Sequence, residues 1–152
     1  MRNISVFVND KKIRTEVPIS QTLLDFLRSN GITSVKRGCE SGECGACAVL
    51  IDDEPRASCI TLTLQADGKE IKTVEALSTR QDLSELQKRF IEVGAIQCGY
   101  CTPALLLLAG HYLNTAVSPL EKDLREAISG VLCRCTGYVK PVEAIKKEIR
   151  LD

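Results

Sequence analysis

The sequence has no surplus of charge of either sign. Its 152 residues include 20 lysine and arginine residues against 20 aspartate and glutamate residues, so the formal net charge at pH 7 is zero. Proteins that bind nucleic acid or anionic membrane surfaces concentrate positive charge on the contact face or in a tail. The balanced composition therefore gives no reason to expect either partner.

Long apolar segments are absent as well. The longest apolar run, residues 104–110, is far shorter than the roughly 20 residues that cross a bilayer. The first residues, Met1 to Ile4, do not show the apolar core of a secretory signal peptide. We therefore expect no membrane insertion and a cytoplasmic location. A hydrophobic content of 44% is nevertheless enough for a packed core.

Side chains that could carry out substrate chemistry are scarce. The single histidine, His111, stands beside Tyr112 in a leucine-rich stretch, which is more typical of a packed or interface side chain than of a metal ligand. The sequence shows no histidine–carboxylate pair, no nucleophile with a base and no phosphate loop. We therefore expect no catalytic residue on this chain, and any substrate reacts on another chain.

Cysteine is the residue that the chain has in abundance. Eight cysteines in a chain without an export signal are better explained by metal binding than by disulfides, which a reducing compartment disfavours. They form two groups of four: Cys39, Cys44, Cys47 and Cys59, then Cys98, Cys101, Cys133 and Cys135. Polar residues interrupt the apolar pattern between the groups, so we place a boundary near residues 77–81, with one domain over residues 1–77 and another over residues 78–152.

The first of these domains is expected to combine strands with one helix. Residues 4–8 and 13–17 alternate apolar and polar side chains around turn-forming residues, which predicts a hairpin. Residues 22–28 predict a helix that ends near Gly31, and residues 48–51, 58–64 and 71–74 predict further short strands. The pattern is compatible with a β-grasp ferredoxin-like domain, although several α+β folds would also fit.

The second domain is expected to be helical. Leu83, Leu86, Phe90 and Val93 recur at helical spacing, Pro103 suits a first helical turn, and Pro141 begins a last helix. Ser118 to Glu121 predicts a capping box with proline in the first helical position. Four short helices would form a small bundle and bring both pairs of later cysteines to one end. The fold class expected for the whole chain is α+β.

The first cysteine group has the spacing of a plant-type [2Fe-2S] site. Cys39, Cys44 and Cys47 follow the C-x4-C-x2-C pattern, and Cys59 supplies the fourth ligand. Zinc sites favour two matched cysteine pairs, which this pattern does not offer. Interleaved glycines at positions 38, 42 and 45 permit backbone amides to point at sulfur, and Lys36 and Arg37 add positive charge.

The second group is less specific by itself. Cys98-x2-Cys101 against Cys133-x-Cys135 could hold either zinc or a second [2Fe-2S] cluster. The first cluster and the positive end of the helix that follows Cys101 both favour the second cluster. Zinc in this site remains an open alternative.

Four motifs together resemble the iron–sulfur subunit of the molybdenum hydroxylases, the xanthine dehydrogenase and aldehyde oxidoreductase family. They are GECGAC (residues 42–47), Ser58-Cys59, QCGYCTP (residues 97–103) and LCRCTGY (residues 132–138). The resemblance covers essentially the whole chain. It implies an electron-transfer subunit with two [2Fe-2S] clusters, in a complex where a large subunit holds molybdopterin in its dinucleotide form and another subunit holds FAD.

The resemblance also implies roles for individual residues. All eight cysteines would be iron ligands, with the later group nearest the molybdenum centre and the earlier group nearer FAD. Gln97 and the backbone around Cys135 would contact the pterin. Ala104 departs from the glycine that the family usually has after Thr-Pro, so the helix there is expected to sit slightly further from its neighbour or from the pterin. A heterotrimer, or a dimer of heterotrimers, is the expected assembly.

Two rival functions follow from the same residues. A free two-cluster ferredoxin would shuttle electrons without a permanent partner, and a zinc-stabilised module would serve only in protein interaction. The first rival predicts a chain that migrates alone in size-exclusion chromatography, and the second predicts zinc in metal analysis.

Overall fold

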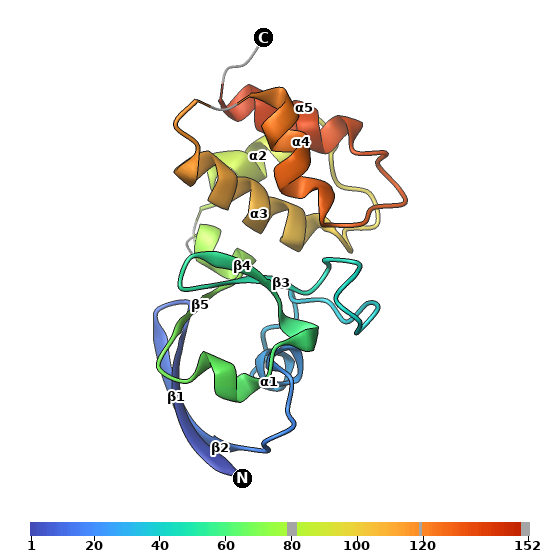
Figure 1. Cartoon of the computed structure of the whole chain (residues 1–152). Helices are drawn as coiled ribbons and strands as arrows, with labels where there is room; N and C mark the ends of the chain where they lie inside the picture. The colour runs from blue at the N-terminus through green and yellow to red at the C-terminus, as the bar shows by residue number, and fades with distance from the viewer. Residues whose placement is uncertain (79–81, 119, 150–152) are drawn as a thin grey trace.

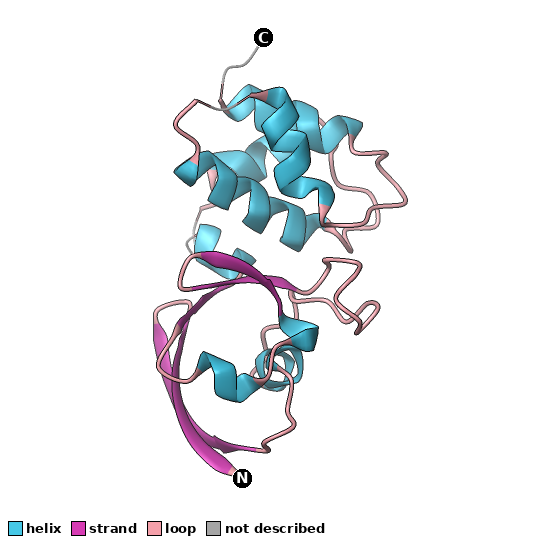
Figure 2. Cartoon of the chain, in the orientation of Figure 1, coloured by secondary structure: helices cyan, strands magenta, loops and turns pink. Residues whose placement is uncertain are grey.

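The computed structural model describes residues 1–78, 82–118 and 120–149, and it shows strands and helices separated along the molecule (Figures 1 and 2). We call residues 2–77 the sheet half and residues 85–148 the helical half. The strands are β1 (Arg2–Val8), β2 (Lys11–Val17), β3 (Ala48–Ile51), β4 (Glu54–Ala57) and β5 (Glu70–Lys72). The α-helices are α1 (Leu23–Ser29), α2 (Glu85–Glu92), α3 (Thr102–Thr115), α4 (Glu121–Ser129) and α5 (Val139–Glu148), and short 3₁₀ helices are η1 (Ser58–Ile60), η2 (Thr63–Ala66) and η3 (Val74–Leu77). The fold is α+β, as predicted.

The strands form one sheet in the order β2-β1-β5-β3-β4. β1 and β5 run parallel, and the other neighbouring pairs run antiparallel. The predicted hairpin is present as β1 and β2, which turn through Asn9 and Asp10 with φ angles of 47° and 65°. Asparagine and aspartate tolerate this left-handed conformation, which two-residue hairpin turns require. The hairpin therefore follows from its turn residues.

Helix α1 covers one face of the sheet. Its N-cap, Thr22, accepts the amide of Asp25 at 3.1 Å, and Gly31 follows the last turn with a φ of 83°. The C-terminal end matches the prediction, because glycine adopts a left-handed φ without steric cost. The N-cap role of Thr22, whose hydroxyl satisfies a free amide, was not predicted. The core between helix and sheet includes Val6, Leu23, Leu24, Phe26, Leu27 and Ile71.

The strand predicted over residues 58–64 is wrong. These residues form η1 and part of η2, and the strand lies earlier, at β4. The apolar side chains that prompted the prediction face outward, since Ile60 is 63% exposed and Leu62 is 41% exposed. β4 is a polar edge strand that carries Pro55, and proline is tolerated at an edge because it has no amide to donate.

Helices α2 to α5 enclose a second core. Pro103 lies in the first turn of α3, as predicted, and Leu105, Leu106 and Leu107 are buried. Phe90 of α2, Leu124 and Ile128 of α4, and Ala144 and Ile145 of α5 complete this core.

The capping box predicted at Ser118 to Glu121 is also wrong. Helix α4 begins at Glu121 with Leu120 as its N-cap and no side-chain cap, and Pro119 lies outside the described residues. Helix α5 begins at Val139, two residues before Pro141, after Tyr138 with a φ of 65°.

The two halves are packed together rather than joined by a bare linker. Ala48 of β3 and Val74 and Leu77 of η3 are partly buried against the helical core. A Cβ atom at Gly110 of α3 would lie 3.3 Å from Leu77, which shows how closely α3 approaches η3. No helix within the described ranges has the length and apolar character needed to cross a membrane.

Candidate metal centres

The first cysteine group is assembled by the β3–β4 pair and the loop before it, residues 36–47, which we call the cysteine loop. Ala48 pairs with Ala57 at the end of the two strands, so Cys47 and Ser58 continue the alignment. The Ser58 amide and hydroxyl both donate to the Cys47 carbonyl oxygen, at 3.3 and 2.8 Å. This arrangement brings the thiols of Cys47 and Cys59 close enough for Cys47, after burial, to raise the pKa of Cys59.

Backbone amides of the cysteine loop point at sulfur. The amides of Ser41 and Cys44 lie 3.4 and 3.3 Å from the Sγ of Cys39, and the Cys39 amide lies 3.5 Å from the Sγ of Cys44. Gly42 and Gly45 have left-handed φ angles of 83° and 65°, as predicted for these glycines. Gly38 does not have a positive φ; it leaves room for sulfur instead, because a Cβ atom there would lie 2.7 Å from the Sγ of Cys44.

Hydrogen bonds and burial give the thiols of this group different pKa values. Hydrogen bonds from the Ser41 hydroxyl and amide, and then from the Cys44 amide, lower the pKa of the exposed Cys39 thiol to about 5. Burial, followed by the neighbouring Cys47 thiol, raises the pKa of Cys59 to about 11. Amide donors stabilise a thiolate and an apolar environment disfavours it, so the exposed end of the group is the anionic one.

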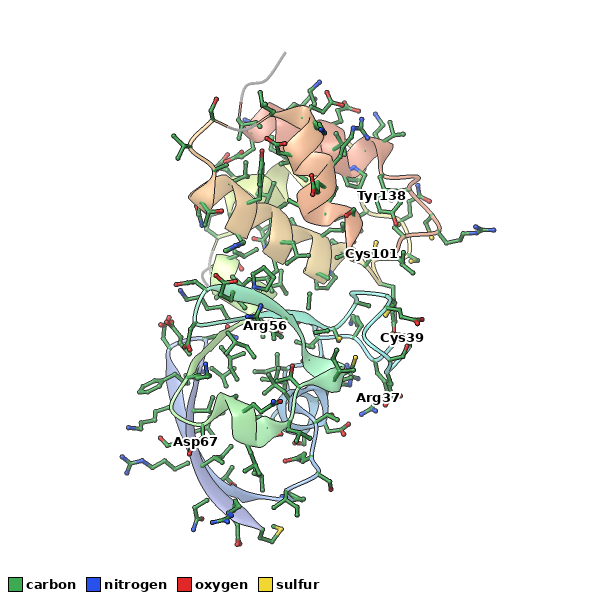
Figure 3. The ribbon with its side chains drawn as sticks, in the orientation of Figure 1. Arg37, Cys39, Arg56, Asp67, Cys101 and Tyr138 are labelled. Atoms are coloured by element: carbon green, nitrogen blue, oxygen red, sulfur yellow. The ribbon has the colours of Figure 1, made fainter. Side chains whose placement is uncertain are left out.

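The second cysteine group lies at one end of the helical half, as predicted. Cys98 and Cys101 precede α3, with Cys101 as its N-cap, and Cys133 and Cys135 lie in the loop between α4 and α5. The thiol of Cys101 is a near neighbour of that of Cys133, which adds to the effect of burial on the pKa of Cys101. The thiol of Cys98 is likewise a near neighbour of that of Cys135, whose pKa it raises. Figure 3 shows the labelled Cys101 and Cys39 on the same side of the molecule in this view.

Burial and hydrogen bonds also give the thiols of the second group different pKa values. Burial, followed by a hydrogen bond with Cys133, raises the pKa of Cys101 to about 12. Burial opposes ionisation of Cys133 too, but hydrogen bonds from the Thr136 hydroxyl and amide outweigh it and lower the pKa of Cys133 to about 7. The neighbouring Cys98 thiol raises the pKa of Cys135.

Tyr138 organises the loop that carries Cys133 and Cys135. Its hydroxyl accepts the Cys133 amide at 2.8 Å and donates to the Val131 carbonyl at 3.1 Å. Its own amide donates to the Thr136 hydroxyl at 3.1 Å, and that hydroxyl lies 3.1 Å from the Cys133 sulfur. Tyr138 belongs to a motif that the sequence singled out, but its role in holding the loop was not predicted.

The two cysteine groups are joined by contacts between the halves. The Leu132 amide donates to the Cys44 carbonyl at 2.9 Å. A residue of the first group is therefore hydrogen-bonded to the residue that precedes Cys133 of the second group. Tyr100, between Cys98 and Cys101, donates its hydroxyl to the Arg37 carbonyl in the cysteine loop. The first bond joins backbone to backbone and the second joins a side chain to backbone, and the sequence predicted neither.

The other residues singled out by the sequence have different surroundings. Gln97 and Arg134 are exposed beside the second group. Ala104 is 2% exposed within the helical core. His111 lies away from the cysteines and lines a cavity between the halves with Lys72 and Leu107. Arg37 is ion-paired with Asp25 and, at 2.6 Å, with Glu40, whereas the Lys36 amine donates to the Thr33 carbonyl at 3.1 Å.

Two family models match the chain. Residues 6–77 match a 2Fe-2S iron-sulfur cluster binding domain, and residues 73–146 match a [2Fe-2S] binding domain. Each match covers one cysteine group, so iron–sulfur binding is a property of both halves.

Several known proteins are similar to this chain over most of its length. The small FeS subunit of nicotinate dehydrogenase from Eubacterium barkeri is 45% identical over 128 residues, covering 84% of this chain and 82% of that subunit. The iron-sulfur-binding subunit of xanthine dehydrogenase from Escherichia coli O157:H7 is 42% identical over 128 residues, covering 81% of this chain and 79% of that subunit. The crystal structure of quinoline 2-oxidoreductase from Pseudomonas putida 86 contains a chain that is 43% identical and matches with a TM-score of 0.90, covering 95% of this chain and 90% of that chain. The chain described here therefore belongs to the iron–sulfur small subunits of the molybdenum hydroxylase family, and its function is electron transfer within an oxidoreductase complex.

Proposed function

We propose that this chain relays electrons from a large molybdopterin subunit, through its helical half and then its sheet half, to an FAD subunit. The observation that carries the proposal is the 2.9 Å hydrogen bond from the Leu132 amide to the Cys44 carbonyl, which joins the immediate surroundings of two separate cysteine groups. A [2Fe-2S] cluster accepts and releases one electron at a time. The protein contributes sulfur ligands, amide donors and a fixed separation between the two sites.

Each cysteine group is proposed to hold one cluster. The ligands would be Cys39, Cys44, Cys47 and Cys59 in the sheet half, and Cys98, Cys101, Cys133 and Cys135 in the helical half. The thiols lie in neighbouring pairs, such as Cys47 with Cys59 and Cys101 with Cys133. Because a cluster of two irons takes its four cysteines two to an iron, this paired arrangement fits it.

The ligand spacing of the first group favours a cluster over zinc. Structural zinc sites favour two matched cysteine pairs, which Cys39, Cys44 and Cys47 with the distant Cys59 do not offer. Amides directed at the Cys39 sulfur also suit an anionic iron–sulfur site, because such donors offset negative charge on sulfur.

The finer architecture and assembly are part of the same proposal. We assign a β-grasp ferredoxin-like domain to residues 1–77 and a four-helix domain to residues 78–152, a division supported by the two family matches that meet near residue 77. Gln97 and the backbone around Cys135 are proposed to meet the pterin, and both residues are exposed. The proposed assembly is a heterotrimer or a dimer of heterotrimers. The proposed location is the cytoplasm, because a reducing compartment keeps cysteines from forming disulfides.

Single-ligand variants test the cluster assignment. We expect Cys44→Ala and Cys133→Ala each to lose about half of the iron and one of the two paramagnetic resonance signals, because each change damages one site. Far-UV circular dichroism of each variant establishes that the rest of the chain is folded. Loss of both signals from a folded variant, or loss of no iron, would contradict two independent four-cysteine sites.

Size-exclusion chromatography separates the relay from a free carrier. A permanent subunit elutes with a molybdopterin protein and a flavoprotein, whereas a free ferredoxin elutes near its own mass of 16.7 kDa. Elution of the native, untagged chain at its own mass would exclude the relay and leave the free carrier.

A further inference from the structure

Tyr100 connects the two halves through a side chain that belongs to the second cysteine group. It lies between Cys98 and Cys101, and its hydroxyl donates to the carbonyl of Arg37, two residues before Cys39. A Cβ atom at Gly38 would lie 3.8 Å from the Tyr100 hydroxyl oxygen and 2.7 Å from the Cys44 sulfur. The hydroxyl therefore meets the cysteine loop beside Gly38, where the loop backbone passes close to the Cys44 thiol.

Arg37, whose carbonyl accepts this hydrogen bond, is fixed in place by its own side chain. The Arg37 guanidinium is ion-paired with Asp25 of α1 and, at 2.6 Å, with Glu40 of the cysteine loop. Asp25 in turn accepts the Thr22 hydroxyl at 2.8 Å, at the start of α1. Tyr100 thus binds a segment of the loop that is anchored to the helix beneath the sheet.

A second contact lies on the same boundary between the two halves. We call this boundary the seam; it consists of Tyr100 with Arg37, Leu132 with Cys44, and Gly45 with Gly130 and Val131. The Leu132 amide bonds to the Cys44 carbonyl at 2.9 Å, and Gly45 packs directly against Gly130 and Val131. The helical half therefore contacts the cysteine loop at both ends of the segment from Arg37 to Gly45. Two separated contacts resist rotation of one half against the other, which a single hydrogen bond would allow.

We propose that Tyr100 is a positioning residue that holds the two cysteine groups at a fixed separation by fastening the Cys98–Cys101 turn to the cysteine loop. The inference rests on the proposed relay and gives a role to Tyr100, the one side chain between the two cysteines of the QCGYCTP motif that is not glycine. Intercluster electron transfer depends steeply on separation, so a bond that fixes the seam also fixes the transfer rate. The phenolic oxygen is the part of the side chain that matters, because the ring alone would leave the Arg37 carbonyl without its donor.

Tyr100→Phe in the native complex tests the role of this oxygen. The matched control is Tyr112→Phe, which removes a hydroxyl that donates to the Leu120 carbonyl at 3.2 Å, entirely within the helical half. Two readouts that do not depend on turnover are compared: the magnetic interaction between the two reduced clusters in paramagnetic resonance spectra, and the hydrogen exchange rate of the Leu132 amide.

We expect Tyr100→Phe to weaken or spread the magnetic splitting, and to speed exchange at Leu132 by about 2- to 10-fold, the range that one net hydrogen bond supplies. Tyr112→Phe should leave both readouts at wild-type values. Unchanged splitting and exchange in Tyr100→Phe, with two cluster signals present, would overturn the positioning role. Absence of two signals in the wild-type complex would overturn the relay itself, so the two failures are distinguishable.

Discussion

Gly45 and Gly130 approach so closely that a Cβ atom on Gly45 would lie 2.0 Å from the Gly130 carbonyl oxygen. Gly45 belongs to the cysteine loop and Gly130 caps the end of α4, so this contact lies on the seam between the halves. Real side chains do not approach a backbone oxygen at that distance. The absence of a Cβ at Gly45 is therefore a condition for the observed arrangement of the two cysteine groups.

Gly45→Ala is expected to separate the halves at this point. The new methyl group has to displace backbone, in addition to the strain of roughly 1–2 kcal/mol that a left-handed φ imposes on alanine. Gly68→Ala is the matched control, because Gly68 also has a positive φ of 77° but nothing within 4 Å of its Cβ position. Thermal unfolding should show a larger loss for Gly45→Ala than for Gly68→Ala, and exchange at Leu132 should rise only in the former. Equal losses in both variants would show that the contact with Gly130 is unimportant.

Asp25→Asn is expected to loosen the anchor of the cysteine loop. Hydrogen bonds from Arg37 and then from Thr22 lower the pKa of Asp25 below its usual 3.8, so the ionised carboxylate stabilises the fold. That stabilisation is present above pH 3.8 and is lost as the pH falls through the lowered value. The pair is about two fifths exposed, so solvent screening keeps its contribution to the free energy of unfolding small.

Urea unfolding of the metal-free chain measures this effect. At pH 7 the unfolding midpoint of Asp25→Asn should be lower than that of the wild type, and the gap should close below pH 3.8. Asp52→Asn should show the same pH dependence, because the Glu70 amide at 3.0 Å and then Lys69 lower the pKa of the Asp52 carboxyl. A gap that widens as the pH falls would contradict the assigned direction of the pKa shift.

Alkylation of the metal-free chain should begin at Cys39. The thiolate is the reactive form, and Cys39 is exposed with a pKa lowered to about 5 by the Ser41 and Cys44 hydrogen bonds. Cys59 and Cys101 are buried with pKa values raised to about 11 and about 12. At pH 7, mass spectrometry after brief iodoacetamide treatment should find Cys39 modified first. Comparable modification of Cys59 or Cys101 in the folded chain would refute this order.

Thr136→Val should shift the reduction potential of the helical-half centre in the negative direction. The Thr136 hydroxyl lies 3.1 Å from the Cys133 sulfur, and donors to sulfur stabilise the reduced, more negative state. A redox titration should show a change on the order of tens of millivolts in one signal. Thr115→Val is the control, since the Thr115 hydroxyl donates to the His111 carbonyl at 2.9 Å, away from both groups. A positive shift would show that this hydroxyl does not donate to the sulfur.

Local features of the fold could be read from the sequence because their causes are local. The turn at Asn9 and Asp10, the end of α1 near Gly31 and the first-turn Pro103 each depend on residues within a few positions. The strand expected over residues 58–64 failed because alternating apolar side chains there, Ile60 and Leu62, face outward. The spacing of apolar residues along a sequence does not show whether another element of the fold covers their side chains.

The contact between the cysteine groups could not be predicted for a different reason. Tyr100 donates to a backbone carbonyl 63 residues away, and every residue has such a carbonyl. The Leu132 amide likewise bonds to backbone, so no side-chain pattern marks either partner. The sequence could group the cysteines by spacing, because ligand spacing is imposed by the cluster, but the seam that joins the groups depends on tertiary packing.

The most direct test of the account is iron, labile sulfide and zinc analysis of the native complex, together with paramagnetic resonance after reduction. Two [2Fe-2S] centres on this chain predict four irons, four sulfides and two distinguishable signals, with no zinc bound to it. Two irons with one signal, and zinc in the remaining cysteine group, would contradict the two-centre relay and make the helical half a structural module.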